Sequence, residues 1–291
     1  FAGGGMIFCT GEVLADITTD ARGVSEMRAG GAPFNVACDV KALGGEAGFY
    51  GCVGKDEAGD MLVRFARERR LGGLIARSDL PTTAARVSVD ERGERSFAFD
   101  ASGTADCELD ADVLARLLPE SGVLHLGSLM LRAENGRKYA SDAARLAKAR
   151  GLKVSFDINL REGLYPSNRA ALDASNEVIR VADILKLSGE EAYALTGERD
   201  AAVSALTLSG GIRTVFVTLG ERGAVAAAGG KCIFSPARRV KVADTTGAGD
   251  AFFAAALLAL SRGKSVADAL GAGTEAGAFA AVTPASVLPV D

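Results

Sequence analysis

Short apolar segments alternate with amphipathic stretches along the second half of the chain. Strand-like runs occupy residues 152–157, 182–187 and 214–218, and helix-like periodicity fills the intervals between them. This alternation predicts an α/β fold with a mainly parallel sheet that helices cover on both faces. Ligands of such sheets bind at the carboxyl ends of the strands. Four polar residues are expected there: Asn159, Ser188, Thr218 and Asp244.

The first third of the chain has a different, two-residue period. Residues 86–89 and 96–99 alternate apolar and polar side chains around a polar turn at 90–93, which predicts a β-hairpin. Together with a strand at 14–18, this hairpin would form a small sheet beside the main one. The apolar face of that sheet must cover either a ligand or a partner subunit. Two phenylalanines belong to this face: Phe97 and Phe99.

A glycine-rich segment stands directly before the longest apolar run, residues 251–260. That run is about half the length that crosses a bilayer, so it predicts a buried helix. The preceding segment reads Asp244-Thr245-Thr246-Gly247-Ala248-Gly249-Asp250, and small residues at a helix start leave backbone amides open to an anion. A carboxylate beside a bound phosphate suggests a proton acceptor next to a phosphoryl group. Taken alone, a glycine-rich turn with an Asp in the first helical turn is an equally good interpretation.

A second glycine pair opens another apolar helix near the N-terminus. The segment Gly30-Gly31-Ala32-Pro33-Phe34-Asn35-Val36-Ala37 begins it, and Leu43-Gly44-Gly45 ends it. With residues 244–250, this segment resembles the signature pair of the ribokinase-like (phosphofructokinase-B type) carbohydrate kinases. Further segments follow in the order of that family: 11–16, 51–59, 156–161, 186–191 and 217–223.

The resemblance covers nearly the whole chain and is closest to the fructokinases. It implies a single ribokinase-like α/β domain over residues 1–291, with a small β lid whose strands come from about 12–30 and 83–103. It also implies ATP-dependent phosphorylation of a primary hydroxyl of a sugar, with D-fructose expected first. In this family pattern Asp250 is the general base, and the amides of Gly247, Ala248 and Gly249 form the anion hole.

The resemblance implies metal ions as well. Mg²⁺ must bridge the nucleotide phosphates, and the Asn-x-x-Glu element of the family corresponds here to Ser188-Gly189-Glu190-Glu191. Glu191 would support the hydrated magnesium, whereas Ser188 departs from the usual asparagine. On spacing alone, the two glutamates are an acidic first helical turn. The family often uses a monovalent cation, K⁺, for which Asp244 and Thr246 are candidate ligands, although Asp244 could equally cap the turn.

The resemblance places the sugar and the nucleotide on two sets of residues. The sugar contacts are Asp16, Gly30, Gly31, Asn35, Phe97, Asn159, Arg161 and Asp250. The ATP contacts are Lys186, Ser188, Thr218, Gly220, Gly223, Gly247, Gly249, Gly277 and Ala278. Structural alternatives stay open, because polar residues also cap turns and small residues also pack helices together.

The acceptor is the least determined part of this assignment. Arg161 leaves 2-keto-3-deoxygluconate as an alternative acceptor, since a guanidinium can pair with the carboxylate of an acid sugar. Its structural alternative is a surface arginine tied to Asp157 or Glu162. Ribose and nucleosides remain further acceptors, because catalytic parts are shared while the lid decides the substrate. A catalytically silent sugar-binding regulator is disfavoured by the intact Gly-Ala-Gly-Asp element.

The composition of the chain limits the classes of partner that it could bind. A formal net charge of −4 gives no electrostatic footprint for nucleic acid or an anionic membrane. The first residues, 1–5, are expected to be a leader outside the fold, and no signal-like segment is evident, so we expect a cytoplasmic protein. Its five scattered cysteines would then be reduced thiols, and His125 a core residue of an apolar strand. A homodimer formed through the lid is expected.

Overall fold

The larger of two sheets forms the centre of the molecule. The computed structural model describes residues 4–89, 95–161, 163–283 and 285–289. Within these residues the larger sheet has nine strands, in the order β13-β12-β11-β10-β9-β8-β1-β4-β5. They are β1 (Met6–Thr10), β4 (Ala47–Gly54), β5 (Gly72–Ser78), β8 (Gly122–Leu126), β9 (Lys153–Asp157), β10 (Ile184–Ser188), β11 (Thr214–Thr218), β12 (Ala224–Ala228) and β13 (Lys231–Ser235).

Most of this sheet is parallel, as the sequence predicts. The pairs from β5 through to β11 run parallel, and only β12 and β13 are added antiparallel at one edge. The central strands are continuous apolar runs because both of their faces are covered. In β11, for example, Val215, Phe216 and Val217 are all fully buried.

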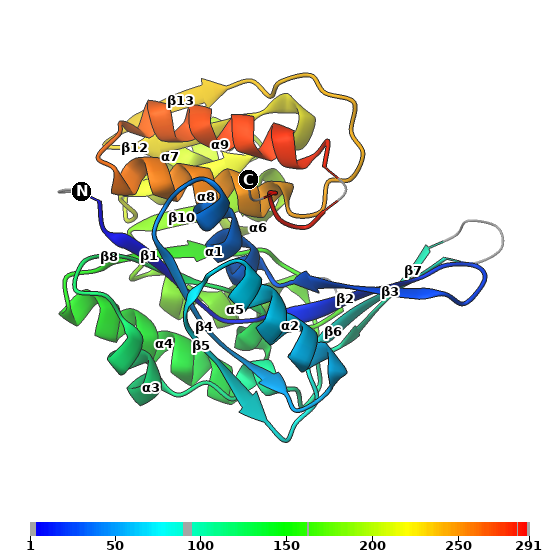
Figure 1. The fold of residues 1–291 in the computed structure, drawn as a ribbon. Coiled ribbons are helices and arrows are strands. Elements are labelled where there is room, and N and C mark those ends of the chain that lie inside the picture. The colour runs from blue at the N-terminus through cyan, green and yellow to red at the C-terminus, as the bar shows by residue number, and fades with distance from the viewer. Residues whose placement is uncertain (1–3, 90–94, 162, 284, 290–291) are drawn as a thin grey trace.

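Helices cover both faces of the sheet (Figure 1). One face packs against α1 (Ala32–Ala42), α2 (Glu57–Glu68), α8 (Ala248–Ser261) and α9 (Val266–Ala280). The other packs against α3 (Ala111–Leu117), α4 (Glu134–Ala149), α5 (Asn168–Ile179), α6 (Gly189–Thr196) and α7 (Ala201–Ser209). The apolar run 251–260 is buried within α8, which confirms the prediction. None of the helices in the described part of the chain is long and apolar enough to cross a bilayer.

A second, four-stranded sheet projects from one side of the molecule (Figure 1). It contains β2 (Leu14–Thr19), β3 (Ser25–Gly30), β6 (Ala84–Val89) and β7 (Arg95–Asp100), in the order β3-β2-β6-β7. The predicted hairpin is therefore present as β6 and β7, while its turn at 90–93 lies outside the described residues. We refer to these four strands as the lid sheet.

The two faces of the lid sheet have different neighbours. Ala15 and Ile17 pack toward Met61 of α2, which covers that face. Strand register puts Asp16 beside Ala85, and Ala85 beside Phe99, so these residues share the opposite face. The side chain of Phe97 lies outside the described part of the structure, and only its backbone pairing with Val87 is defined.

One expected position is wrong. Asp244 does not follow a strand of the parallel sheet, because residues 236–247 form a loop between β13 and α8. The alternation of Val240 and Val242 with charged residues resembles a strand, but no described strand pairs with them. Asn159, Ser188 and Thr218 do lie at carboxyl ends of parallel strands, as predicted. The cysteines are unpaired, and four of the five are buried.

Candidate functional site

The N-terminus of α8 begins at a position that only glycine fills. Gly247 caps the helix with a φ of 77°, and a Cβ atom there would lie 2.1 Å from the carbonyl oxygen of Ser286. A side chain is therefore excluded both by conformation and by space. The amide of the next residue, Ala248, donates to the carbonyl oxygen of Thr245 at 3.2 Å. The glycine thus brings the C-terminal segment, the loop and the first turn of α8 into close contact.

Asp250 lies in this first turn and is nearly buried. Its Oδ2 atom accepts a hydrogen bond of 2.8 Å from Nδ2 of Asn35, in the first turns of α1. Burial raises the pKa of Asp250, while Lys186, the hydrogen bond from Asn35 and the charge of Arg161 oppose that rise. The two glycine-opened helices predicted from the sequence therefore meet at their N-terminal ends, and a basic carboxylate lies at the junction.

A buried ion pair lies beside the same helix start. Nζ of Lys186 on β10 donates to Oδ2 of Asp157 on β9 at 2.7 Å, and both side chains are almost fully buried. The carboxylate raises the pKa of Lys186 in spite of burial, which lowers it. A Cβ atom on Gly249 would lie 3.3 Å from this Nζ. The missing side chain of Gly249 therefore leaves the ammonium group close to the backbone of α8.

Asp16 brings a second carboxylate toward Asp250 from the lid sheet. A Cβ atom on Gly30 would lie 2.2 Å from Oδ2 of Asp16, so this glycine leaves space for the carboxylate. Burial raises the pKa of Asp16 to about 6; Arg161 opposes the rise and the charge of Asp250 adds to it. Since Arg161 acts on both carboxylates, the three charged groups belong to one site. Gly31, with a φ of 110°, has the additional role of allowing the entry of α1.

Asn159 and Arg161 follow the end of β9, and the charge of Arg161 acts on Asp16 and Asp250. Asn159 has a φ of 40°, a conformation that asparagine tolerates better than most residues, and its carbonyl oxygen accepts from the Ser128 hydroxyl at 3.4 Å. Arg161 is exposed. Its predicted structural partner Asp157 is engaged by Lys186 instead, and Glu162 lies outside the described residues.

Comparison with known proteins identifies the family of this chain. The family model described as pfkB family carbohydrate kinase matches residues 6–290. The chain belongs to this family. Fructokinase-1 of Zea mays is 37% identical over 270 residues, which cover 88% of this chain and 83% of the relative. The chain is thus a carbohydrate kinase, and the ribokinase-like fold predicted from its sequence is confirmed.

Two solved structures resemble this carbohydrate kinase over almost its full length. A double mutant of fructokinase from Vibrio cholerae O395, with fructose, ADP and a potassium ion bound, has a TM-score of 0.85 and 29% identity, and the match covers 97% of this chain and 93% of that chain. Aminoimidazole riboside kinase from Salmonella enterica, in complex with aminoimidazole riboside and an ATP analogue, has a TM-score of 0.84 and 27% identity, with coverage of 98% and 97%.

In this pfkB-family kinase, Ser188 and Glu191 form a capping box at the start of α6. Oε2 of Glu191 accepts from the amide of Ser188 at 2.6 Å, and the Ser188 hydroxyl accepts from the amide of Glu191 at 3.2 Å. The other carboxylate oxygen accepts from the amide of Leu160 at 2.6 Å. The acidic first turn considered from the sequence is therefore present. No group of three potential metal-ligating side chains occurs in the described ranges.

Five of the nine residues expected around the nucleotide lie at the end of β11, just after it, or in α9. Thr218 ends β11, Gly220 begins the 3-10 turn η3 (Gly220–Arg222), and a Cβ on Gly223 would lie 2.1 Å from the carbonyl oxygen of Ser235. A Cβ on Gly277 would lie 3.1 Å from the carbonyl oxygen of Ala248. Gly277 therefore packs α9 closely against the first turn of α8, next to the half-buried Ala278.

The predicted cation ligands form a local turn. Oδ1 of Asp244 accepts from both the amide and the hydroxyl of Thr246, at 2.9 and 2.7 Å. This is the self-capping arrangement that the sequence left open.

A groove of about 730 Å³ between α8, α9 and the end of α1 is lined by residues such as Leu258 and Phe279, and it contains none of the predicted site residues.

Two buried carboxyl groups near the site have no role in the sequence-based assignment. Glu12 follows β1, lies against Gly127, and burial raises its pKa to about 7. Asp39 lies one helical turn after Asn35, and its Oδ1 accepts from the amide of Leu288 at 2.6 Å; burial raises its pKa to about 8. The sequence offers one signal for Asp39, the four-residue spacing from Asn35 on one helix face. His125 is buried in β8 as expected, and burial lowers its pKa to about 3.

Proposed function

We propose that this kinase transfers the γ-phosphoryl group of ATP to a primary hydroxyl of D-fructose, with Asp250 as general base. The observation that carries the proposal is the buried carboxylate of Asp250 at the N-terminus of α8, oriented by Asn35. The fructokinases among its relatives support fructose as the acceptor. A sugar hydroxyl is a poor nucleophile at neutral pH, so a positioned base is required.

The proposed chemical step is an in-line displacement. Asn35 occupies Oδ2 of Asp250, so Oδ1 would accept the hydroxyl proton. The sugar oxygen forms a bond to the γ-phosphorus, the bond between this phosphorus and its bridging oxygen breaks, and ADP leaves with the electron pair. The raised pKa of Asp250 makes it a better proton acceptor than an ordinary carboxylate.

Negative charge on the transferring group would be stabilised by two features. The amides of Gly247 and Gly249 belong to the start of α8, where the helix dipole favours an anion. Lys186 lies close to Gly249 and would place a positive charge beside them. The amide of Ala248 already donates to Thr245, so we assign it the weaker share of the anion hole.

Metal ions would act on the nucleotide side. Magnesium would neutralise phosphate charge, and Glu191 would reach it only through water because both carboxylate oxygens already accept main-chain hydrogen bonds. The Vibrio cholerae fructokinase holds a potassium ion. We propose that Asp244 and Thr246 help to bind such an ion here, with the nucleotide lying along Thr218, Gly220, Gly223, Gly277 and Ala278.

The sugar would lie between the lid sheet and the end of β9. Asp16, Asn35 and Asn159 offer carboxylate and amide groups that pair with adjacent hydroxyls. Arg161 favours a second candidate, an acid sugar such as 2-keto-3-deoxygluconate, because its guanidinium is exposed and Asp157 is already paired. Ribose and ribosides come after these two acceptors.

The test is a side-by-side comparison of kcat/KM for fructose, 2-keto-3-deoxygluconate and ribose with ATP. We expect fructose to be the best acceptor, and Arg161→Ala to change its kcat/KM by less than about tenfold, since fructose offers no carboxylate. A preference for the acid sugar that collapses in Arg161→Ala would replace fructose by the second candidate. If the enzyme phosphorylates none of these three acceptors, the proposal is overturned.

A further inference from the structure

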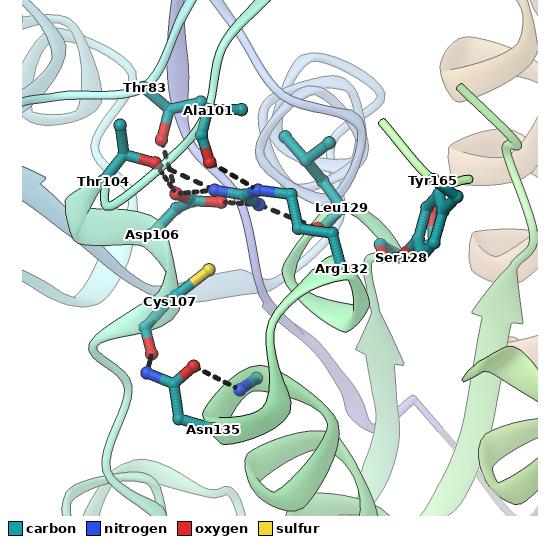
Figure 2. Close-up of polar contacts among 11 residues, drawn as sticks. Thr83, Ala101, Thr104, Asp106, Cys107, Ser128, Leu129, Arg132, Asn135 and Tyr165 are labelled. Atoms are coloured by element: carbon teal, nitrogen blue, oxygen red, sulfur yellow. Dashed lines mark hydrogen bonds and ion pairs between the residues drawn. The ribbon is translucent and has the colours of Figure 1, made fainter. Parts of the chain in front are cut away.

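A buried ion pair between Asp106 and Arg132 lies outside the machinery described so far (Figure 2). Asp106 belongs to the 3-10 turn η1 (Ala105–Cys107), and Arg132 ends the 3-10 turn η2 (Leu129–Arg132). Their side chains are 0% and 8% exposed. Charges buried to this degree are costly unless every donor and acceptor finds a partner.

All five guanidinium donors of Arg132 have partners. Nη1 donates to Oδ2 of Asp106 at 2.7 Å and to the carbonyl oxygen of Leu129 at 2.8 Å. Nη2 donates to Oδ1 of Asp106 at 2.7 Å and to the Thr104 hydroxyl at 2.8 Å. Nε donates to the carbonyl oxygen of Ala101 at 2.7 Å. The pair is thus bidentate, a geometry that lysine cannot reproduce.

The partners of this pair belong to the two connections that join the β6–β7 hairpin to the body of the molecule. Thr83 immediately precedes β6, and its hydroxyl donates to Asp106. Ala101 immediately follows β7, and Thr104 lies in the same return connection, where its hydroxyl also donates to Asp106. Figure 2 shows these groups converging on the carboxylate and guanidinium. Both ends of the β6–β7 hairpin are therefore tied to one point.

The Asp106–Arg132 pair is also connected to residues beside the proposed sugar site. Segment 127–132, at the end of β8, carries Arg132 together with Gly127, which lies against Glu12, and Ser128, which donates to the carbonyl oxygen of Asn159. The turn η1 has a further bond to the segment after η2, because Asn135 of α4 donates to the carbonyl oxygen of Cys107 at 2.8 Å. Segment 127–132 therefore links the base of the β6–β7 hairpin to the end of β9.

Stability alone does not account for such a pair, since well-packed apolar side chains often replace a buried ion pair without loss of stability. We propose that Asp106 and Arg132 are positioning residues: they form a clasp that fixes the base of the β6–β7 hairpin and thereby holds the lid sheet over the sugar. The part concerning sugar rests on the proposed function. Neither residue is expected to touch sugar or nucleotide.

Two variants loosen the clasp while leaving the charge of Asp106 compensated. Arg132→Lys keeps the positive charge but loses the fork, and Thr83→Val removes one buried hydrogen bond at the entry to β6. The matched control is Asp100→Asn, which breaks the exposed pair of Arg86 and Asp100 within the same hairpin. Exposed ion pairs of this kind contribute little to the stability of the folded protein.

The first readout is amide hydrogen exchange of residues 84–89 and 98–100 in the protein without ligand. We expect exchange at least about tenfold faster in Arg132→Lys than in the control, and a smaller acceleration in Thr83→Val. Exchange in both variants as slow as in the control would overturn the clasp. This readout needs no substrate, so it decides the clasp even if the proposed kinase reaction fails. If Arg132→Lys does not fold, Thr83→Val decides by the same criterion.

The second readout is steady-state kinetics. Loosening of the clasp should raise KM for fructose about five- to tenfold, with kcat and KM for ATP changed by less than about twofold. A merely structural defect would affect both substrates equally, and that result would overturn the positioning role. Absence of sugar phosphorylation by the unmodified protein would instead refute the proposed function.

Discussion

Asp250 is a buried carboxylate whose surroundings suit a base rather than a structural group. Its single described side-chain donor, Asn35, occupies one oxygen and leaves the other for a substrate. Asp250→Asn keeps the shape of the side chain and an acceptor for Asn35, but it cannot take a proton. We expect turnover to fall by about two to four orders of magnitude while fructose affinity stays within a few-fold.

The measurement combines steady-state kinetics with calorimetric titration of fructose. Asp268→Asn is the control, because Asp268 is exposed at the start of α9 and away from the site. A turnover of Asp250→Asn equal to that of the control would remove Asp250 from its proposed role.

Asp39 gives a second prediction at this scale, concerning pH. Burial raises its pKa to about 8 and that of Glu12 to about 7, so between neutrality and pH 8 the folded state holds protons that the unfolded chain has released. Stability should therefore fall as pH rises from about 6.5 to 8, by roughly 1 to 3 kcal/mol. Below that window the buried His125 acts in the opposite direction, since its pKa is lowered.

Asp39→Asn mimics the protonated carboxyl and can still accept from Leu288. It should flatten the decline in the free energy of unfolding, measured by urea denaturation at a series of pH values. The exposed Asp79→Asn serves as control, because Lys55 holds the pKa of Asp79 below its usual range and its titration falls outside this window. An Asp39→Asn profile as steep as that of the control would contradict the assignment.

At the scale of elements, the packing of α9 against α8 determines which glycines of α9 can be replaced by a larger residue. A Cβ on Gly273 would lie 2.8 Å from the ring of Phe252, whereas Gly271 on the same helix has nothing within 4 Å of its Cβ position. Gly273→Ala should destabilise the protein by about 1–3 kcal/mol through overpacking. Gly271→Ala should stabilise it by about 0.5–1 kcal/mol through helix propensity.

Thermal and urea denaturation of the two variants provide the comparison. Equal effects of the two substitutions would mean that close packing against Phe252 is not what requires glycine in α9.

The elements themselves were largely predictable from the sequence, because local patterns encode them. Periodicity predicted β9, β10 and β11, the hairpin of β6 and β7, and the buried α8, and glycine-rich starts predicted the entries of α1 and α8. Contacts between distant segments have no such local signal. The Lys186–Asp157 pair depends on the register of β10 against β9, and the Leu288–Asp39 bond joins residues 249 positions apart.

Residue roles were less predictable for the same reason. The Ser188–Glu191 spacing is equally consistent with a metal site and with a capping box, and only the folded geometry reveals that main-chain amides occupy both oxygens of Glu191. Asp106 and Arg132 carry no motif at all, because each becomes informative only through its partner 26 residues away.

At the scale of the whole molecule, one face of the lid sheet packs on α2 and the other carries Asp16 and Phe99. We propose that this second face also forms a homodimer. Sedimentation equilibrium should find a dimer at micromolar concentration, and Phe99→Asp should shift it toward monomer by burying a charge at the interface. Val24→Asp, at an exposed turn of the same sheet, is the control. A monomer in the unmodified protein would contradict the dimer.

The central claim is that a sugar lies under the lid sheet with a hydroxyl against Asp250. The most direct measurement is a crystal structure with fructose and a non-hydrolysable ATP analogue. We predict a primary hydroxyl about 2.6–3.2 Å from the Asp250 carboxylate, within hydrogen-bond reach, and in line with a γ-phosphate at the amides of Gly247 and Gly249. A complex in which every fructose hydroxyl is out of reach of Asp250, or in which the phosphates lie away from the start of α8, would contradict it.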